Sequence, residues 1–312
     1  MLIKFLQEQR TIGLSIFRVL LSVLIIRNAL SYLPLANTIF GKEGIAPFVI
    51  YERSFHGMFP GVLYPFEGVW DAKMLLLLTI GLAFLFLLGI GRGFTGMLLW
   101  LCLVIFFKRN IFIMDGSDNV MMVALPFLSI AESYNYQTIK FNIRYKFGFW
   151  KKPVFQFIRE QIRTLALLGF LLQIALIYLS TGIEKVLLRE WQSGTALYYA
   201  LRLEEFIDSS WNIPLTQSAL FVYIGTYASL LFDLSFGILV WFRKLRLWMV
   251  LWGISFHVGI WFFMGLDAFS FIMISTYFVF FTNNEYIIGW SFIKAKWTGK
   301  KTNNEAKEKY AA

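Results

Sequence analysis

Residues 163–185 read RTLALLGFLLQIALIYLSTGIEK, a nearly unbroken apolar run. A helix of ~17–25 apolar residues is long enough to cross the ~30 Å hydrocarbon layer of a membrane. Comparable runs predict further spans at residues 12–32, 74–91, 94–114, 218–242, 247–265 and 267–283, and a shorter run containing Pro126 predicts one more at 117–131. The fold class expected is therefore all-α, a polytopic transmembrane helix bundle of about eight spans.

The composition excludes an ordinary soluble domain. Of the 312 residues, 58% are hydrophobic and only 15% are charged, and the mean hydropathy is +0.63. A soluble domain carries roughly 25% charged residues and ~45–50% apolar ones. Most of the apolar surface must therefore face lipid or other helices. The single cysteine, Cys102, has no partner, which excludes a disulfide scaffold and a cysteine-based zinc site.

The distribution of charge predicts which side of the membrane each loop faces. With eight spans both termini lie on one side, and that side holds 19 of the 29 lysines and arginines. Because basic loops favour the cytoplasm, we expect a multi-pass protein of the cell membrane with both termini cytoplasmic. The net charge of +10 does not indicate a nucleic acid partner, because no soluble face carries the basic residues. Membrane lipid is the partner that this pattern favours.

Two stretches outside the spans complete the predicted organisation. We divide the chain into a transmembrane domain, residues 1–283, and a basic tail, residues 284–312, which is expected to be disordered in the cytoplasm. Residues 134–157 mix aromatic and basic side chains, a pattern typical of an amphipathic segment at the membrane interface. Docking of a partner is the alternative reading of that segment.

Motifs of familiar soluble enzymes are missing, so polar residues at membrane depth become the candidates for function. Lys185 is expected at the outer end of its span. It is either a lysine that extends to the interface beside Trp191, or a base activated by apolar surroundings. His257 is expected ~12 Å below the outer surface, either as a structural hydrogen-bonding residue or as a contact for a ligand. No second ligand stands at i+3 or i+4 of His257, so a metal site is not expected.

Charged residues near the first and third spans raise a question of pairing. Asp115 and Asp118 flank an Asp-Gly turn and are read either as a helix cap or as partners of Arg27 in the first span. Glu184 is another candidate partner of Arg27. Arg27 is also expected to be more deeply partnered than Arg18.

A second pair is expected nearer the cytoplasmic side, between Arg18 and Asp233. The topology then gathers most of the remaining polar candidates on the opposite side. It predicts a polar site in the outer half of the bundle, made of Arg27, Asp115, Asp118, Glu184, Lys185 and His257.

Several of these residues belong to motifs that resemble those of one family. The motifs are Arg92-Gly-Phe-Thr-Gly, Asp115-Gly-Ser-Asp118, Tyr178-xxx-Gly182-xx-Lys185, Trp191-xx-Gly194-Thr-Ala-Leu-Tyr and Phe256-His257-xx-Ile260. Together they resemble the HTTM superfamily, the membrane domain shared by vitamin K-dependent gamma-glutamyl carboxylases and many bacterial proteins. Within it, the chain is most similar to the SdpB type, which is required to mature a secreted peptide toxin of the sporulation-delaying kind.

The resemblance implies roles for the candidate residues. In the carboxylases a lysine in this Gly-xx-Lys setting deprotonates reduced vitamin K, and Lys185 stands at the matching position. On this basis Lys185, His257 and Glu184 are the candidate catalytic residues. A reduced quinone is a candidate cofactor by resemblance alone. The candidate substrate-binding residues are Arg27, Asp115, Asp118 and Trp191.

Two classes of function follow from this resemblance. In the first, the protein is an intramembrane enzyme, of carboxylase-like or quinol-dependent type, that modifies an exported antimicrobial or toxin peptide. In the second, it is a non-catalytic scaffold or escort that binds the precursor peptide or a soluble or peripheral maturation partner. If the first holds, Lys185 and His257 are expected to face one cavity. Lys185→Met and His257→Phe are then expected to abolish activity without loss of thermal stability.

Overall fold

The computed structural model describes residues 9–41, 44–45, 72–131, 133–134, 153–206 and 208–298. No strand occurs among these residues, and the predicted all-α class is confirmed. All of their longer helices except α17 follow the predicted apolar runs. They are α2 (Thr11–Tyr32), α7 (Ala72–Leu87), α8 (Arg92–Arg109), α9 (Gly116–Ile130), α10 (Pro153–Leu187), α14 (Ala219–Leu239), α15 (Arg243–Met264), α16 (Asp267–Thr276) with its 3-10 continuation η5 (Tyr277–Phe280), and α17 (Asn283–Thr298).

Four helical segments are long and apolar enough to cross a membrane. They are α10, α14, α15 and the segment Thr11–Phe40, in which α2 continues through η1 (Leu33–Leu35) and α3 (Ala36–Phe40). The helices α7 and α9 and the segment Asp267–Phe280 are shorter but also apolar. These helices indicate a membrane protein. The count of eight spans and the cytoplasmic termini stay predictions.

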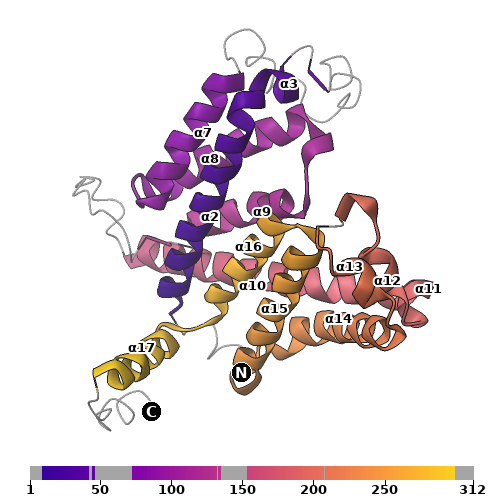
Figure 1. Ribbon diagram of the computed structural model, residues 1–312. Coiled ribbons are helices and arrows are strands. Elements are labelled where there is room, and N and C mark those ends of the chain that lie inside the picture. Colours follow the sequence, from indigo (N-terminus) through magenta and orange to yellow (C-terminus); the bar gives the residue numbers. More distant parts are fainter. Residues whose placement is uncertain are drawn as a thin grey trace.

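The helices pack in two groups that share a continuous core. Figure 1 shows α7 beside α2 and α8 beside α7 in one part of the molecule, and α14 beside α10 and α15 beside α14 in the other. The ring of Phe17 on α2 stacks on that of Phe170 on α10 with centroids 5.2 Å apart, and both side chains are buried. The two groups therefore meet through large apolar side chains, whose close van der Waals packing stabilises the contact.

Short helices fill the connection between α10 and α14. These are α11 (Arg189–Gln192), α12 (Ala196–Ala200), the 3-10 turn η4 (Glu204–Phe206) and α13 (Asn212–Thr216). They gather at the carboxyl end of α10 and pack on α14 (Figure 1). The amide of Leu197 donates to Thr226 Oγ1 on α14 at 3.0 Å. This connection therefore covers the first half of α14.

The expected tail begins as a helix, which is a correction. Residues 284–298 belong to α17, whereas residues 299–312 lie outside the described residues. The helix begins at a reciprocal cap. The Thr282 amide donates to Glu285 Oε2 at 2.7 Å, and the Glu285 amide donates to Thr282 Oγ1 at 3.2 Å. Arg246 adds hydrogen bonds to the same carboxylate.

The start of α17 is also tied to the start of α2. Asn283 Nδ2 donates to Thr11 Oγ1 at 2.9 Å, and the Ile12 amide donates to Asn283 Oδ1 at 3.0 Å. The beginning of the first described helix and the beginning of the last therefore lie at the same end of the bundle. Of the expected amphipathic segment 134–157, residues 135–152 lie outside the described residues, and 153–157 form the first turn of α10.

Candidate functional site

Two glycines bring α10 and α14 into close contact. A Cβ added to Gly182 would lie 2.9 Å from Leu234 Cδ2 and 3.0 Å from the Leu234 amide nitrogen. A Cβ on Gly237 would lie 2.8 Å from the carbonyl oxygen of Ala175. A side chain at either position would press against the other helix, so glycine is needed at both positions of this crossing. The crossing sets Lys185, one turn after Gly182, opposite Asp233 on α14.

Lys185 forms a largely buried ion pair with Asp233. Its Nζ donates to Asp233 Oδ2 at 2.6 Å and to Ser229 Oγ at 3.0 Å. The side chain of Lys185 is 15% exposed and that of Asp233 is 3% exposed. The predicted pair between Asp233 and Arg18 is therefore wrong. Asp233 lies on the same face of its helix as Ser229, one turn away, so both reach the same amine.

Trp191 covers this pair from the side of α11. The Lys185 Nζ lies 4.2 Å from the centroid of the Trp191 ring and 5.7 Å from that of Phe256, which are cation–π distances. The chain reverses after α11 at Gly194, whose φ of +76° is one that glycine adopts without strain. Tyr227 on α14 holds the turn by donating to the Gln192 carbonyl at 2.7 Å. The expected neighbourhood of Lys185 and Trp191 is confirmed.

The depth expected for Lys185 stays a prediction, and the same contacts give its position relative to α14. The carboxyl end of α10 lies opposite Ser229 and Asp233, which are ~15 to ~21 Å along α14 from its start at Ala219. The depth expected from the sequence assumes that neighbouring spans end at the same level in the membrane. Instead, α14 extends beyond α10, and α11 to α13 lie against the extra length. Lys185 is directed into the bundle and does not extend along its edge.

His257 lies in a second polar cluster made of three helical segments. Its Nε2 is 2.8 Å from the hydroxyl of Tyr178 on α10, and that hydroxyl is 2.5 Å from the hydroxyl of Tyr277 on η5. All three side chains are buried. Gly253, one turn before His257, leaves room for the Tyr277 hydroxyl, which a Cβ at that position would overlap. The Nδ1 of His257 has no hydrogen-bond partner within the described part of the chain.

The two clusters lie next to each other. Tyr178 precedes Lys185 by two turns on one face of α10, and Phe256 precedes His257 on α15 while its ring also faces the Lys185 amine. The Phe256 ring also lies 5.2 Å from the His257 ring, centroid to centroid, so it contacts both clusters. An amine, a carboxylate, an imidazole and two phenols thus share one aromatic surrounding. That the two residues face one cavity stays a prediction.

Glu184 is exposed on α10 and does not join this site. The carboxylate that accompanies Lys185 is Asp233. Arg18 is also placed differently from the prediction, because it is fully buried and bonds to backbone carbonyls. It donates to Ser133 O at 3.1 Å, and to the carbonyl oxygens of Phe86 and Leu87.

Arg27, Asp115 and Asp118 form a separate polar region. Arg27 pairs with Asp267, and these side chains are 54% and 41% exposed. The predicted partners of Arg27 are therefore wrong, and so is the expectation that Arg27 is more deeply partnered than Arg18. Asp115 accepts from the amide of Asp118 at 3.2 Å, and Asp118 accepts from the amide of Asp115 at 3.1 Å. This reciprocal cap at the start of α9 confirms the helix-cap reading.

The residues around Lys185 do not fit a quinol. The amine is already bound by Asp233 and Ser229, and Trp191 covers it at 4.2 Å. A quinol ring would have to displace Trp191 to reach the amine. We therefore derive no step through a quinol.

Four hydrogen-bond partners in the site were not identified from the sequence. Asp233 and Ser229 bind Lys185, and Tyr178 links His257 to Tyr277. One signal was available for Asp233, because a carboxylate within an apolar span requires a cation. The heptad spacing of Tyr178 and Lys185 was a weaker signal, since it places both on one face of α10.

Comparison with known proteins matches the part of the chain that makes these contacts to a domain family. Residues 154–284 match the HTTM domain. The expected resemblance is thereby confirmed for this part. The HTTM match contains Tyr178, Lys185, Asp233, His257 and Tyr277, whereas Arg27, Asp115 and Asp118 lie outside it.

The chain is also similar to a curated bacterial protein. It is 30% identical over 215 residues to the sporulation-delaying protein SdpB of Bacillus subtilis (strain 168). The matched part makes up 65% of this chain and 62% of SdpB, so it spans less than two thirds of that relative. No solved structure matches the chain.

Proposed function

We propose that this membrane protein acts in the maturation of an exported peptide of antimicrobial or toxin type. The proposal places it in the cell membrane as a multi-pass protein with both termini in the cytoplasm. Its partners would be the precursor peptide and a soluble or peripheral maturation protein. Support comes from the HTTM match and from the similarity to SdpB.

The Lys185–Asp233 pair, which lies within the HTTM match, is the main support for a functional site. Two opposite charges removed from water cost free energy, and an apolar pair of similar volume would hold the helices equally well. Ser229 and Trp191 complete a small polar group next to His257. We propose that the precursor displaces Trp191 and then contacts Lys185 and His257 at this place. Glutamate carboxylation is not part of the proposal, because it needs an amine that acts as a base, whereas the Lys185 amine donates to Asp233 and Ser229.

The test compares the secreted peptides of strains that differ only in this protein. The gene is deleted from its source organism, and the culture supernatant is analysed by mass spectrometry. We expect at least one secreted peptide to disappear or to change in mass, and the wild-type gene to restore it. An unchanged set of secreted peptides would refute the proposed function.

Site variants in the same strain separate catalysis from scaffolding. The double variant Lys185→Met/Asp233→Val removes both charges together, and Lys244→Met removes an exposed lysine elsewhere as a matched control. If Lys185 touches the precursor, the double variant fails to restore the peptide at a normal protein level while Lys244→Met restores it. Restoration by both variants would assign the polar site to structure and favour the scaffold.

A further inference from the structure

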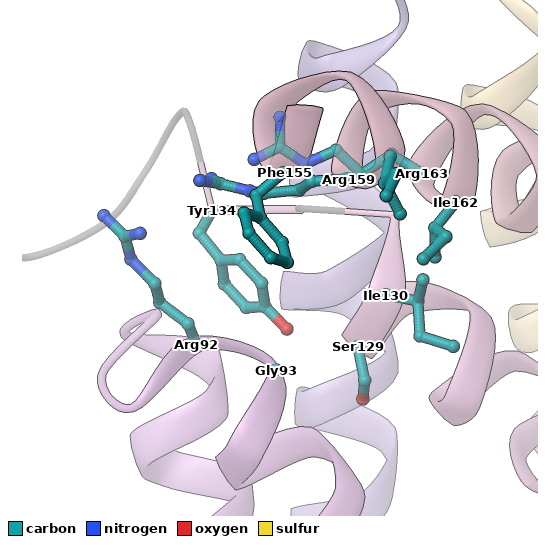
Figure 2. Close-up of a pocket in the computed structure, with 10 residues that line it drawn as sticks. Arg92, Gly93, Ser129, Ile130, Tyr134, Phe155, Arg159, Ile162 and Arg163 are labelled. Carbon is teal, nitrogen blue, oxygen red and sulfur yellow. The ribbon is translucent and has the colours of Figure 1, made fainter. Parts of the chain in front are cut away.

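A cavity of about 240 Å³ lies where the start of α8, the end of α9 and the start of α10 meet. Figure 2 shows the rings of Tyr134 and Phe155 between Arg92 on α8 and Ile162 on α10. The HTTM match covers only the α10 side of this cavity. The cavity also lies apart from Lys185 and His257, neither of which lines it.

The local sequence of α8 explains how this cavity is held open. Arg92 has a φ of 52°, in the left-handed region that a residue with a side chain rarely adopts. The next residue, Gly93, lies so close to the carbonyl oxygen of Ser129 that a Cβ would overlap it. The Gly93 contact fixes the start of α8 against the end of α9, and Arg92 lies at the rim. A strained non-glycine residue at a cavity rim is a reason to look for a ligand.

Three arginines line the cavity, which concentrates positive charge. Arg92 and Arg159 are exposed, and Arg163 is half-buried, close enough to Arg92 for the two charges to interact. Arg163 Nη1 donates to the carboxylate of the exposed Glu160 at 2.5 Å. Among the described residues that line the cavity or contact its arginines, three guanidinium groups meet this one carboxylate, and their planar donors suit phosphate.

Tyr134 contributes its aromatic ring to the same cavity. The ring is 5.9 Å from the guanidinium carbon of the buried Arg18, and burial raises the pKa of its phenol. The hydroxyl donates to the carbonyl oxygen of Leu128 at 3.5 Å, so it is not counted among the donors to a ligand.

The remainder of the lining is apolar and continues along the helix surface. Ile158 and Ile162, one turn apart on α10, are 45% and 50% exposed, and Ile130 on α9 is 42% exposed. Leu165 extends this stripe along α10 beyond the cavity. A basic rim joined to an exposed apolar stripe matches a molecule with an anionic head and a hydrocarbon chain.

We propose that this cavity binds one anionic phospholipid. The phosphate lies against Arg92, Arg159 and Arg163, beside the Tyr134 ring. An acyl chain follows Ile158, Ile162 and Leu165. This region belongs to the side predicted to be cytoplasmic from its basic residues, where anionic headgroups are concentrated. Free phosphate shares the headgroup chemistry but makes no use of the apolar stripe.

Thermal unfolding of the purified full-length protein in detergent tests this proposal. The additives are palmitoyl-oleoyl phosphatidylglycerol, the corresponding phosphatidylcholine and inorganic phosphate. The variants are Arg92→Gly, Arg159→Gln and the exposed control Lys244→Gln. Arg92→Gly is chosen because glycine adopts a φ of 52° without strain, so the fold is kept while the guanidinium is lost.

We expect phosphatidylglycerol to raise the midpoint of unfolding more than phosphatidylcholine or phosphate does. Arg92→Gly and Arg159→Gln should each weaken its apparent affinity by about tenfold, which is the scale of one charge-assisted contact. Lys244→Gln should leave the affinity unchanged. Equal stabilisation by both lipids, or unchanged affinity in both arginine variants, would overturn the proposal. Equal stabilisation by inorganic phosphate would replace the lipid with a free anion.

Discussion

Breaking the Lys185–Asp233 pair from one side should cost far more stability than removing both charges. Lys185→Met leaves the Asp233 carboxylate, which is 3% exposed, without its cation. The attraction between unit charges 2.6 Å apart is about 6 kcal/mol at an effective dielectric constant of ~20, and desolvation of the two groups offsets part of it. We expect each single change, Lys185→Met or Asp233→Val, to cost ~3–5 kcal/mol. The double variant should lose about 1 kcal/mol or less, since no charge remains buried.

The assay is the midpoint of thermal unfolding of the four proteins in one detergent. At roughly 2 °C per kcal/mol for a chain of this size, each single variant should melt about 6–10 °C below the wild type. The double variant should return to within about 2 °C of it. This expectation corrects the view that Lys185→Met alone leaves stability unchanged. Additive losses in the double variant would refute the buried pair, because independent sites add and coupled ones do not.

Three other perturbations test the fold. Arg18→Ala should cost ~2–4 kcal/mol of stability and lower the midpoint of unfolding, because it leaves buried carbonyls without a donor. Arg27→Ala removes an exposed pair and should cost under about 1 kcal/mol. Equal midpoints of the two variants would contradict this order. Gly182→Ala should destabilise by ~1–3 kcal/mol in the same assay, because its Cβ would press on Leu234, and an unchanged midpoint would contradict the close crossing. Reporter fusions within residues 140–155 should give a cytoplasmic signal, and those within 196–212 an exterior one; the opposite pattern would reverse the topology.

The helices could be predicted from the sequence because apolar length and periodicity are local properties. The run 12–32 became α2 at Thr11–Tyr32, and the run 218–242 became α14 at Ala219–Leu239. The start of α10 was missed, since the charges of Arg159 and Arg163 set the expected boundary at 163. The helix begins at Pro153, where proline suits the first turn. An apolar run marks the part of a helix that contacts hydrocarbon, and a helix can continue beyond it.

The pairing of charges could not be predicted in the same way. Which cation meets Asp233 depends on how far α10 and α14 slide along each other, and the contact of Gly182 with Leu234 sets that distance. The expected depths assumed that all spans begin and end at two common planes. Arg27 pairs with Asp267, and not with the expected partners, because α16 begins beside the second half of α2.

The hydrogen bonds of the His257 ring bear on the choice between a catalytic protein and a scaffold. A histidine kept only to hold helices together gains most when both ring nitrogens are hydrogen-bonded, and a buried nitrogen without a partner costs ~1–3 kcal/mol. Here Nε2 meets the Tyr178 hydroxyl, whereas Nδ1 is buried and has no partner among the described residues. Phenylalanine at this position would avoid that cost and keep the ring packing against Phe256 and Phe269. His257→Phe therefore removes the hydrogen bond to Tyr178 and keeps the ring packing, so the secreted-peptide assay with this variant separates a role in precursor binding from a role in packing.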